Sequence, residues 1–155
     1  MEYKQIVRDF VERTRVNLAH IENSLSEGDE VYEVTQLVNS LLGLLVFPEQ
    51  RYFYQIPETP LNQLEKQGWP KIKVVGEYPA ANDLREQMRY LRNSIAHFNL
   101  RFLTNEKSEI SGIRVWNINP RKESRPKTWE AKISLDDLRK LVNKFVDLIL
   151  SEVEA

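Results

Sequence analysis

One short segment combines the better placed of the chain's two histidines with an arginine and an amide. It reads Arg92-Asn93-Ser94-Ile95-Ala96-His97. An imidazole exchanges protons near neutral pH, and a guanidinium binds phosphate oxygens and stabilises charge that develops on them. Because an RNA strand carries its own nucleophile in the 2′-hydroxyl, these two groups could cleave it without a metal. The segment therefore indicates phosphate chemistry, with RNA as a candidate substrate.

A structural interpretation of the same residues stays open. A histidine near the C-terminal end of a helix also acts as a favourable cap for the helix dipole. The other histidine, His20, falls at the edge of an apolar helical stripe, where we expect a boundary residue. A second histidine for catalysis would come most easily from a symmetry-related copy. A two-fold dimer that packs the two motif helices together would bring both copies of Arg92 and His97 to one cleft.

Apolar residues at spacings of three and four predict four long helices. They span residues 3–27, 30–47, 82–98 and 134–153. Gly28 is expected to end the first helix, and Asp29 to cap the second. Asn82 or Asp83 would cap the third, and Ser134 opens a segment typical of a capping box for the fourth.

The third helix carries the motif. Its predicted core stripe is Leu84, Met88, Leu91, Ile95 and Phe98. At ~100° per residue, Arg92 and His97 fall on opposite sides of that stripe. Asn93 shares the solvent side with His97, where its amide can hold the imidazole. Arg85, Arg89 and Arg92 follow one edge and repel one another unless anions or acidic side chains meet them.

Two further segments affect how the motif is presented. The second helix is apolar over most of its circumference, and its narrow polar strip of Gln36, Ser40 and Gly43 would let another helix approach, from this chain or a second copy. Residues 54–81 read as a long loop with a short helix near 61–67. The aromatic residues along it are expected to pin the loop to the core or to stack on bases. They are Tyr52, Phe53, Tyr54 and Trp69.

Residues 99–133 show the two-residue alternation of strands. The alternation covers residues 99–104, 110–119 and 128–133, with a turn near Lys107-Ser108 and a basic loop at 120–127. We expect a small antiparallel sheet of two or three strands, inserted before the last helix.

Length and composition favour one globular domain spanning 1–155, with 41% hydrophobic and 29% charged residues. The absence of cysteine excludes disulfides, thiolate zinc sites and cysteine nucleophiles. Two histidines do not suffice for a histidine-rich metal site. A magnesium site built from carboxylates stays open but has no visible motif, and we expect no metal or cofactor. The N-terminus lacks the apolar stretch of a secretory signal, and the longest apolar run, Leu41 to Phe47, is too short to span a membrane. We therefore expect a cytoplasmic protein without membrane association.

The net charge of -1 hides an asymmetry, because the stretch from Arg85 to Lys127 carries a local balance of +6 and the remainder carries -7. A basic region of this kind can attract a polyanion, although a solvated charged face with local ion pairs would give the same counts. The candidate RNA-binding residues are Arg85, Arg89, Arg121, Lys122, Arg125 and Lys127.

The segment Leu91 to Phe98, the helices before it, the strands after it and the closing amphipathic helix together resemble a HEPN domain. They are similar to the subgroup with a β insertion before the last helix. The resemblance implies a mainly α fold, a HEPN-like helical bundle with a small antiparallel β insertion before the C-terminal helix. It also implies that Arg92 and His97 are a catalytic pair supported by Asn93, at a composite site between two copies.

With this resemblance the sequence favours a metal-independent endoribonuclease of toxin or host-defence type, acting as a homodimer and possessing a cognate antitoxin or regulatory protein. Two other readings stay open. One is a non-catalytic HEPN-like module that binds RNA or protein. The other is a structural subunit that assembles through the apolar second helix. The loop at 54–81 and the sheet depart from the minimal bundle, which leaves the dimer geometry open.

Overall fold

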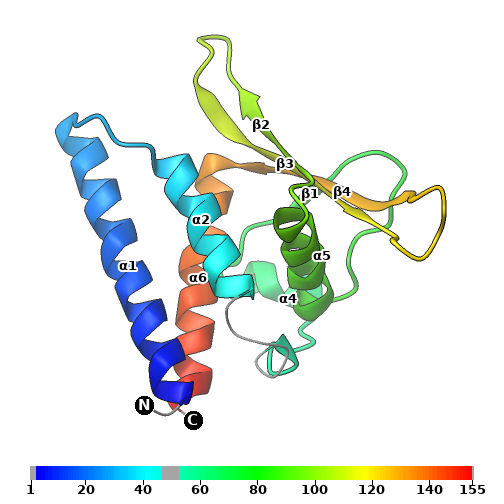
Figure 1. Ribbon diagram of the computed structural model, residues 1–155, viewed down its shortest axis with the longest axis horizontal. Coiled ribbons are helices and arrows are strands. Elements are labelled where there is room, and N and C mark those ends of the chain that lie inside the picture. Colours follow the sequence, from blue (N-terminus) through cyan, green and yellow to red (C-terminus); the bar gives the residue numbers. More distant parts are fainter. Residues whose placement is uncertain (1–2, 47–52, 155) are drawn as a thin grey trace.

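The computed structural model describes residues 3–46 and 53–154. Its elements are α1 (Tyr3–Glu27), α2 (Glu33–Val46), α4 (Leu61–Lys66), β1 (Lys73–Val74), α5 (Leu84–Ala96), β2 (Leu100–Thr104), β3 (Ile110–Ile118), β4 (Lys127–Ser134) and α6 (Leu135–Glu154). The predicted class is confirmed: the fold is mainly α, with an antiparallel sheet before the final helix. Helix α1 packs on α2 and α6, α2 packs on α5, and α5 lies against β3 of the sheet (Figure 1).

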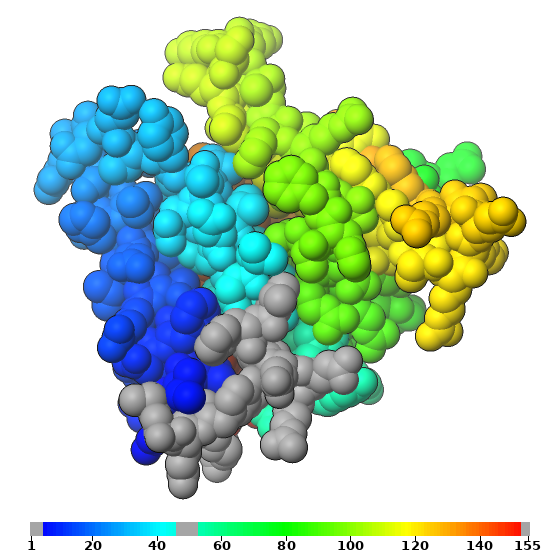
Figure 2. Space-filling view, in the orientation of Figure 1, coloured from blue at the N-terminus to red at the C-terminus, as the bar shows by residue number. Residues whose placement is uncertain are grey.

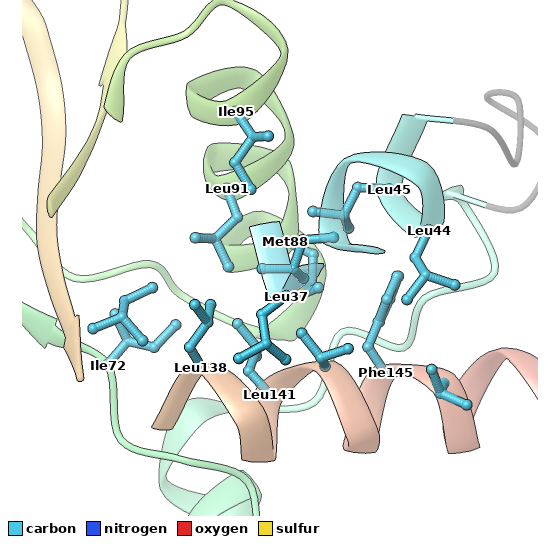
Figure 3. Packing of buried hydrophobic residues seen from close by; sticks show 14 of the residues in the cluster. Leu37, Leu44, Leu45, Ile72, Met88, Leu91, Ile95, Leu138, Leu141 and Phe145 are labelled. Atoms are coloured by element: carbon cyan, nitrogen blue, oxygen red, sulfur yellow. The ribbon is translucent and has the colours of Figure 1, made fainter. Parts of the chain in front are cut away.

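Three helices supply most of the core, because each presents a stripe of large apolar side chains to the others. Figure 3 shows α5 meeting α2 and α6 through these side chains. The buried residues in this view include Leu37, Leu44, Leu45, Met88, Leu91, Ile95, Leu138, Leu141 and Phe145. The predicted stripe of α5 is confirmed except at Phe98, which is 82% exposed. Helix α5 ends at Ala96, so Phe98 leaves the helical path, and its side chain points away from the core.

The α1–α2 connection differs from the prediction in one respect. Gly28 ends the first helix as expected, with a φ of +87° that glycine adopts without strain. The N–H of Asp29 then donates to the carbonyl of Ser24 at 3.0 Å, so Asp29 completes the end of α1 and does not cap α2. Helix α2 therefore begins at Glu33, three residues later than predicted. Its far end, predicted at Phe47 and Pro48, lies outside the described residues.

The polar strip of α2 is a contact with α1 of the same chain. A Cβ added to Gly43 would lie 2.7 Å from the ring of Phe10, which shows how closely the two helices approach. Ser40 is buried beside this contact and accepts a hydrogen bond from Gln36 at 3.4 Å. The buried carboxylate of Glu33 accepts two hydrogen bonds from Arg139, at 2.6 and 2.9 Å, and these tie α2 to α6.

The sheet has four antiparallel strands in the order β1-β4-β3-β2. Strands β2, β3 and β4 lie within a residue or two of the predicted segments, and Ser108 adopts the positive φ of 61° in the turn between β2 and β3. The expectation of two or three strands was wrong, because Lys73 and Val74, within the predicted loop, pair with β4. Helix α6 begins at Leu135, where the hydroxyl of Ser134 accepts the N–H of Asp137 at 3.1 Å.

The segment between α2 and α5 is held to the core by two of its aromatic side chains, Phe53 and Trp69, as predicted. Tyr54 is 65% exposed, and Tyr52 lies outside the described residues. The expected short helix is α4. In the described part of the chain, no helix combines the length and hydrophobicity needed to cross a membrane.

Candidate functional site

Helix α5 positions the motif through well-defined ends. Asp83 precedes the helix in an extended conformation, and its carboxylate accepts the backbone N–H of Glu86 at 2.8 Å. At the other end, the N–H of His97 donates to the carbonyl of Asn93 at 3.1 Å, and the N–H of Asn99 donates to that of Ser94 at 2.7 Å. The N–H of Phe98 also donates to the carbonyl of Ile95 at 3.1 Å, and this bond together with that of Asn99 forms a Schellman ending. The backbone of His97 is therefore fixed while its side chain is exposed.

Phe98 occupies the turn position of that ending with a φ of +57°. Glycine is the usual residue there, because a side chain in the left-handed region costs free energy. The chain thus carries a strained, exposed aromatic residue directly after His97.

Arg92 faces one side of α5. Its guanidinium carbon lies 4.5 Å from the centre of the Phe53 ring, and the side chain lines a cavity of about 100 Å³ with Phe53, Tyr54 and Arg89. Burial lowers the pKa of Arg92 below its ordinary value, and the positive charge of Arg89 lowers it further. The repulsion between Arg89 and Arg92 places two like charges together on this side of α5, where a bound anion would be stabilised.

His97 faces the other side, where a cavity of about 470 Å³ opens between the end of α5 and the end of the sheet. Its lining residues are Asn93, His97, Asn99, Asn117, Ile118, Pro120 and Arg125. The volume lies in the range of small-molecule sites and suits a nucleotide. The lining combines one imidazole, one guanidinium and three amides, groups that pair with phosphate oxygens and with base edges.

Asn93 links the two sides of the helix. Its amide oxygen accepts from Arg92 at 3.3 Å, and its amide nitrogen donates to Asn117 on β3 at 3.2 Å. Asn117 in turn donates to the hydroxyl of Thr128 at 2.7 Å. The amide of Asn93 therefore connects Arg92 with β3 of the sheet, and the hydrogen bond between Asn93 and His97 is a backbone one. Asn117 was missed in the sequence, although a polar residue at a buried alternation position of β3 could have signalled it.

The candidate RNA-binding residues separate into three groups. Arg85 bonds to the carbonyls of Ile56 and Tyr54, at 2.7 and 2.8 Å, and to the carboxylate of Glu58, so its guanidinium holds the loop that carries Phe53. Arg89 is exposed beside Arg92. The others lie on or next to the basic loop: Arg121, Lys122, Arg125 and Lys127 are all exposed, and Arg125 lines the His97 cavity.

Arg92 and His97 line separate cavities of the same chain. Residues 3–46 and 53–154 also contain no group of three His, Asp or Glu side chains placed to hold a metal ion. The surface of α5 (green) is visible between α2 (cyan) and the basic loop (yellow) in Figure 2, so a second molecule could contact it from this side.

The helical bundle, the antiparallel sheet before its last helix, and the arginine and histidine near the end of α5 agree with the HEPN resemblance seen in the sequence. The chain belongs to the HEPN pEK499 p136 family, whose model matches residues 1–155. Neither the curated proteins nor the solved structures contain a significant match. Membership of this family indicates a nucleotide-binding or RNase-like module.

Proposed function

We propose that the protein is a metal-independent endoribonuclease of toxin or host-defence type, with a composite active site formed by two copies of the chain. The observation that carries the proposal is the separation of Arg92 and His97 into two cavities on either side of α5. A two-fold contact along α5 would place the imidazole of one copy near the guanidinium of the other.

The proposed reaction uses the RNA's own hydroxyl. His97 of one copy removes the proton of the 2′-hydroxyl, and the 2′-oxygen attacks the adjacent phosphorus. The bond between phosphorus and the 5′-oxygen breaks, and His97 of the second copy donates a proton to the departing 5′-oxygen. The products are a 2′,3′-cyclic phosphate and a 5′-hydroxyl. The two Arg92 guanidinium groups stabilise the negative charge that develops on the phosphorane oxygens.

The remaining candidate residues would support binding. Asn93 holds Arg92 through the hydrogen bond at 3.3 Å and orients it for the phosphate. Arg89 and the exposed basic loop would steer the RNA, and Arg125 would contact it at the His97 cavity. Arg85 contributes indirectly, because it fixes the loop on which Arg92 packs.

The direct test is cleavage of single-stranded RNA by purified protein in the presence of EDTA. We expect 2′,3′-cyclic phosphate ends, and loss of cleavage in His97→Ala and Arg92→Ala while both variants remain dimeric. Mixing differently tagged wild type and His97→Ala then measures how many histidines each reaction needs. If the heterodimer of wild type and His97→Ala is inactive, each cleavage reaction needs both imidazoles. If it keeps about half of the wild-type activity, each reaction needs only one imidazole. A strictly monomeric protein that cleaves RNA would disprove the composite site.

A non-catalytic module that binds RNA or a partner protein is the second candidate. It is favoured by the packing of Arg92 on Phe53, which together with the bond to Asn93 already engages the guanidinium. In this case wild type and His97→Ala bind RNA equally, without cleavage between pH 6 and 8. Growth arrest on expression, lost in His97→Ala and relieved by a co-expressed neighbouring protein, would support the toxin and its antitoxin or regulator.

A further inference from the structure

We propose that the face of the sheet turned away from α5 is a second RNA-binding surface, which holds the sugar–phosphate backbone outside the cleavage site. The proposal rests on RNA being the ligand of the proposed function. It concerns a set of residues that the motif does not include.

The observation is a row of four cations that crosses all four strands. Arg101 on β2 is paired with Arg114 on β3, Arg114 with Lys132 on β4, and Lys132 with Lys73 on β1. Directly paired residues point to the same face of a sheet, so the four side chains share one face. The flanking residues Val115 and Ala131 are fully buried and belong to the opposite face, which packs on the helices.

This row is unfavourable for the sheet by itself. Like charges directly opposite one another on neighbouring strands destabilise the pairing, and here three such pairs follow in succession. One carboxylate relieves them, since Glu130 bonds to Arg114 and to Lys127. Lys73, Arg101 and Lys132 are exposed and have no carboxylate partner among the described residues. An arrangement that costs stability and leaves cations free is expected where an anion binds.

Arg101, at the end of the row, and Lys127, beside the row, are held in place by Trp116. The Lys127 ammonium lies 4.9 Å from the centre of the Trp116 ring, and the Arg101 guanidinium carbon lies 6.0 Å from it. These cation–π contacts keep both charges at the sheet surface. The ion pairs of Glu130 with Arg114 and Lys127 fix these two cations. Burial alone would raise the pKa of Glu130, but hydrogen bonds from these two cations hold it below the ordinary value.

Two cations of the sheet surface, Arg101 and Lys127, follow closely in the chain after residues that line the His97 cavity. Asn99 lines the cavity, and Arg101 follows two residues later on β2; Arg125 lines the cavity, and Lys127 follows two residues later at the start of β4. Arg101 and Lys127 both contact Trp116. An RNA strand that leaves the cavity can therefore pass between these two cations onto the row. This proximity to the His97 cavity favours a nucleic acid over a membrane surface.

The test measures binding separately from cleavage. Single-stranded RNA of about 20 nucleotides, with 2′-O-methyl groups that remove the nucleophile, is titrated against the protein at several salt concentrations. The variant K73Q/K132Q removes two exposed cations of the row, and K66Q/K140Q removes two exposed lysines from α4 and α6 as a matched control. Each lost phosphate contact should lower the slope of log K against log salt by about 0.7, so K73Q/K132Q should lower it by about 1.4.

The expected affinity loss for K73Q/K132Q is about tenfold at low salt, and it should be much smaller for an RNA of about four nucleotides that fills only the cavity. The control should keep the wild-type slope. Because Lys73 and Lys132 repel each other, K73Q/K132Q should melt no lower than wild type, which separates lost binding from lost folding. The variant R101Q, at the opposite end of the row, is an independent test. It should lower the slope of log K against log salt by about 0.7.

Unchanged affinity and slope in K73Q/K132Q and R101Q would overturn this surface, and cleavage dependent on His97 would show that the proposed function survives. Reduced binding by these variants in a protein that cleaves no RNA would support the surface and reject the nuclease. Binding of wild type to phosphatidylserine vesicles, but not to RNA, would also overturn the proposal.

Discussion

The two sides of α5 differ in size, burial and charge. The Arg92 side is a small cavity of about 100 Å³ with two arginines and an aromatic wall, and it lacks room for a nucleotide. The His97 side is a cavity of about 470 Å³ lined by amides, with an exposed imidazole at its edge. In the proposed function, the Arg92 side stabilises negative charge and the His97 side holds the nucleotide. In the proposed function, one helix supplies two half-sites, and a complete site forms where half-sites of two copies meet.

The largest expected effect is at the His97 side. His97→Ala should lower the rate of RNA cleavage by about 10² to 10⁴, the usual contribution of a general acid or base. His20→Ala removes the other histidine, exposed on α1, and should leave the rate unchanged. Single-turnover cleavage of labelled RNA measures both. An equal loss in the two variants would mean that His97 has no special role.

The next effect is at the Arg92 side. Arg92→Lys keeps the charge, but a lysine cannot bond to Asn93 and to a phosphate with the fixed geometry of a guanidinium. We expect kcat to fall about 10- to 100-fold. Arg89→Lys, one turn earlier, should cost less, because Arg89 has no bond to Asn93. Larger losses at Arg89 than at Arg92 would reverse the assignment of the two arginines.

The link between the two sides can be broken at Asn117. Asn117→Ala leaves the amide of Asn93 and the hydroxyl of Thr128 without their partner, which should lower the free energy of unfolding by about 1 to 3 kcal/mol. Urea denaturation measures this loss. Because Asn93 and Asn117 share one hydrogen bond, the effects of Asn93→Ala and Asn117→Ala should not be additive. Additive effects would show that the amides are not coupled.

The stability that the sheet gains from Glu130 should depend on pH. Its pKa lies below the ordinary value of 4.5, so Glu130 stabilises the fold above that pH and loses this contribution as pH falls through its lowered value. Glu130→Gln should cost about 1 to 2 kcal/mol at neutral pH. The difference between wild type and variant should shrink as pH falls below 4.5. Thermal unfolding from pH 3 to 7 checks this, and a constant difference would contradict it.

The smallest expected effect tests the repulsion between Arg89 and Arg92. Arg89→Gln removes the charge that helps to lower the pKa of Arg92, so it should raise stability by a few tenths of a kcal/mol. It should also weaken any stabilisation by added sulfate, because one of two cations is lost. The matched variant Arg125→Gln, on the His97 side, should lack the gain in stability. A loss of stability in Arg89→Gln would mean that the two arginines do not repel each other.

Periodic segments of the chain were predictable from sequence, and solitary contacts were not. The helices and the three longer strands were found because repeated apolar spacing determines which face is buried. Strand β1 was missed because a two-residue strand has no measurable alternation. Asp29 was misassigned because its N–H serves the preceding helix, a choice that depends on the turn geometry at Gly28.

The candidate site was predictable to a similar extent. Opposite placement of Arg92 and His97 around α5 follows from helical geometry alone. The structural role of Arg85 depends on Ile56, 29 positions away, and the position of Asn117 beside Asn93 depends on how β3 packs on α5. Such contacts join residues far apart in sequence, and local patterns carry no information about them.

The shortness of β1 has a dynamic consequence. Two ladder positions and one further bond, from the N–H of Val75 to the carbonyl of Glu130 at 2.9 Å, attach this strand to β4. So few backbone bonds at a sheet edge should open more readily than the rest of the sheet. The amide of Val75 should then exchange with deuterium rapidly in the free protein, and more slowly when a bound polyanion joins Lys73 to Lys132.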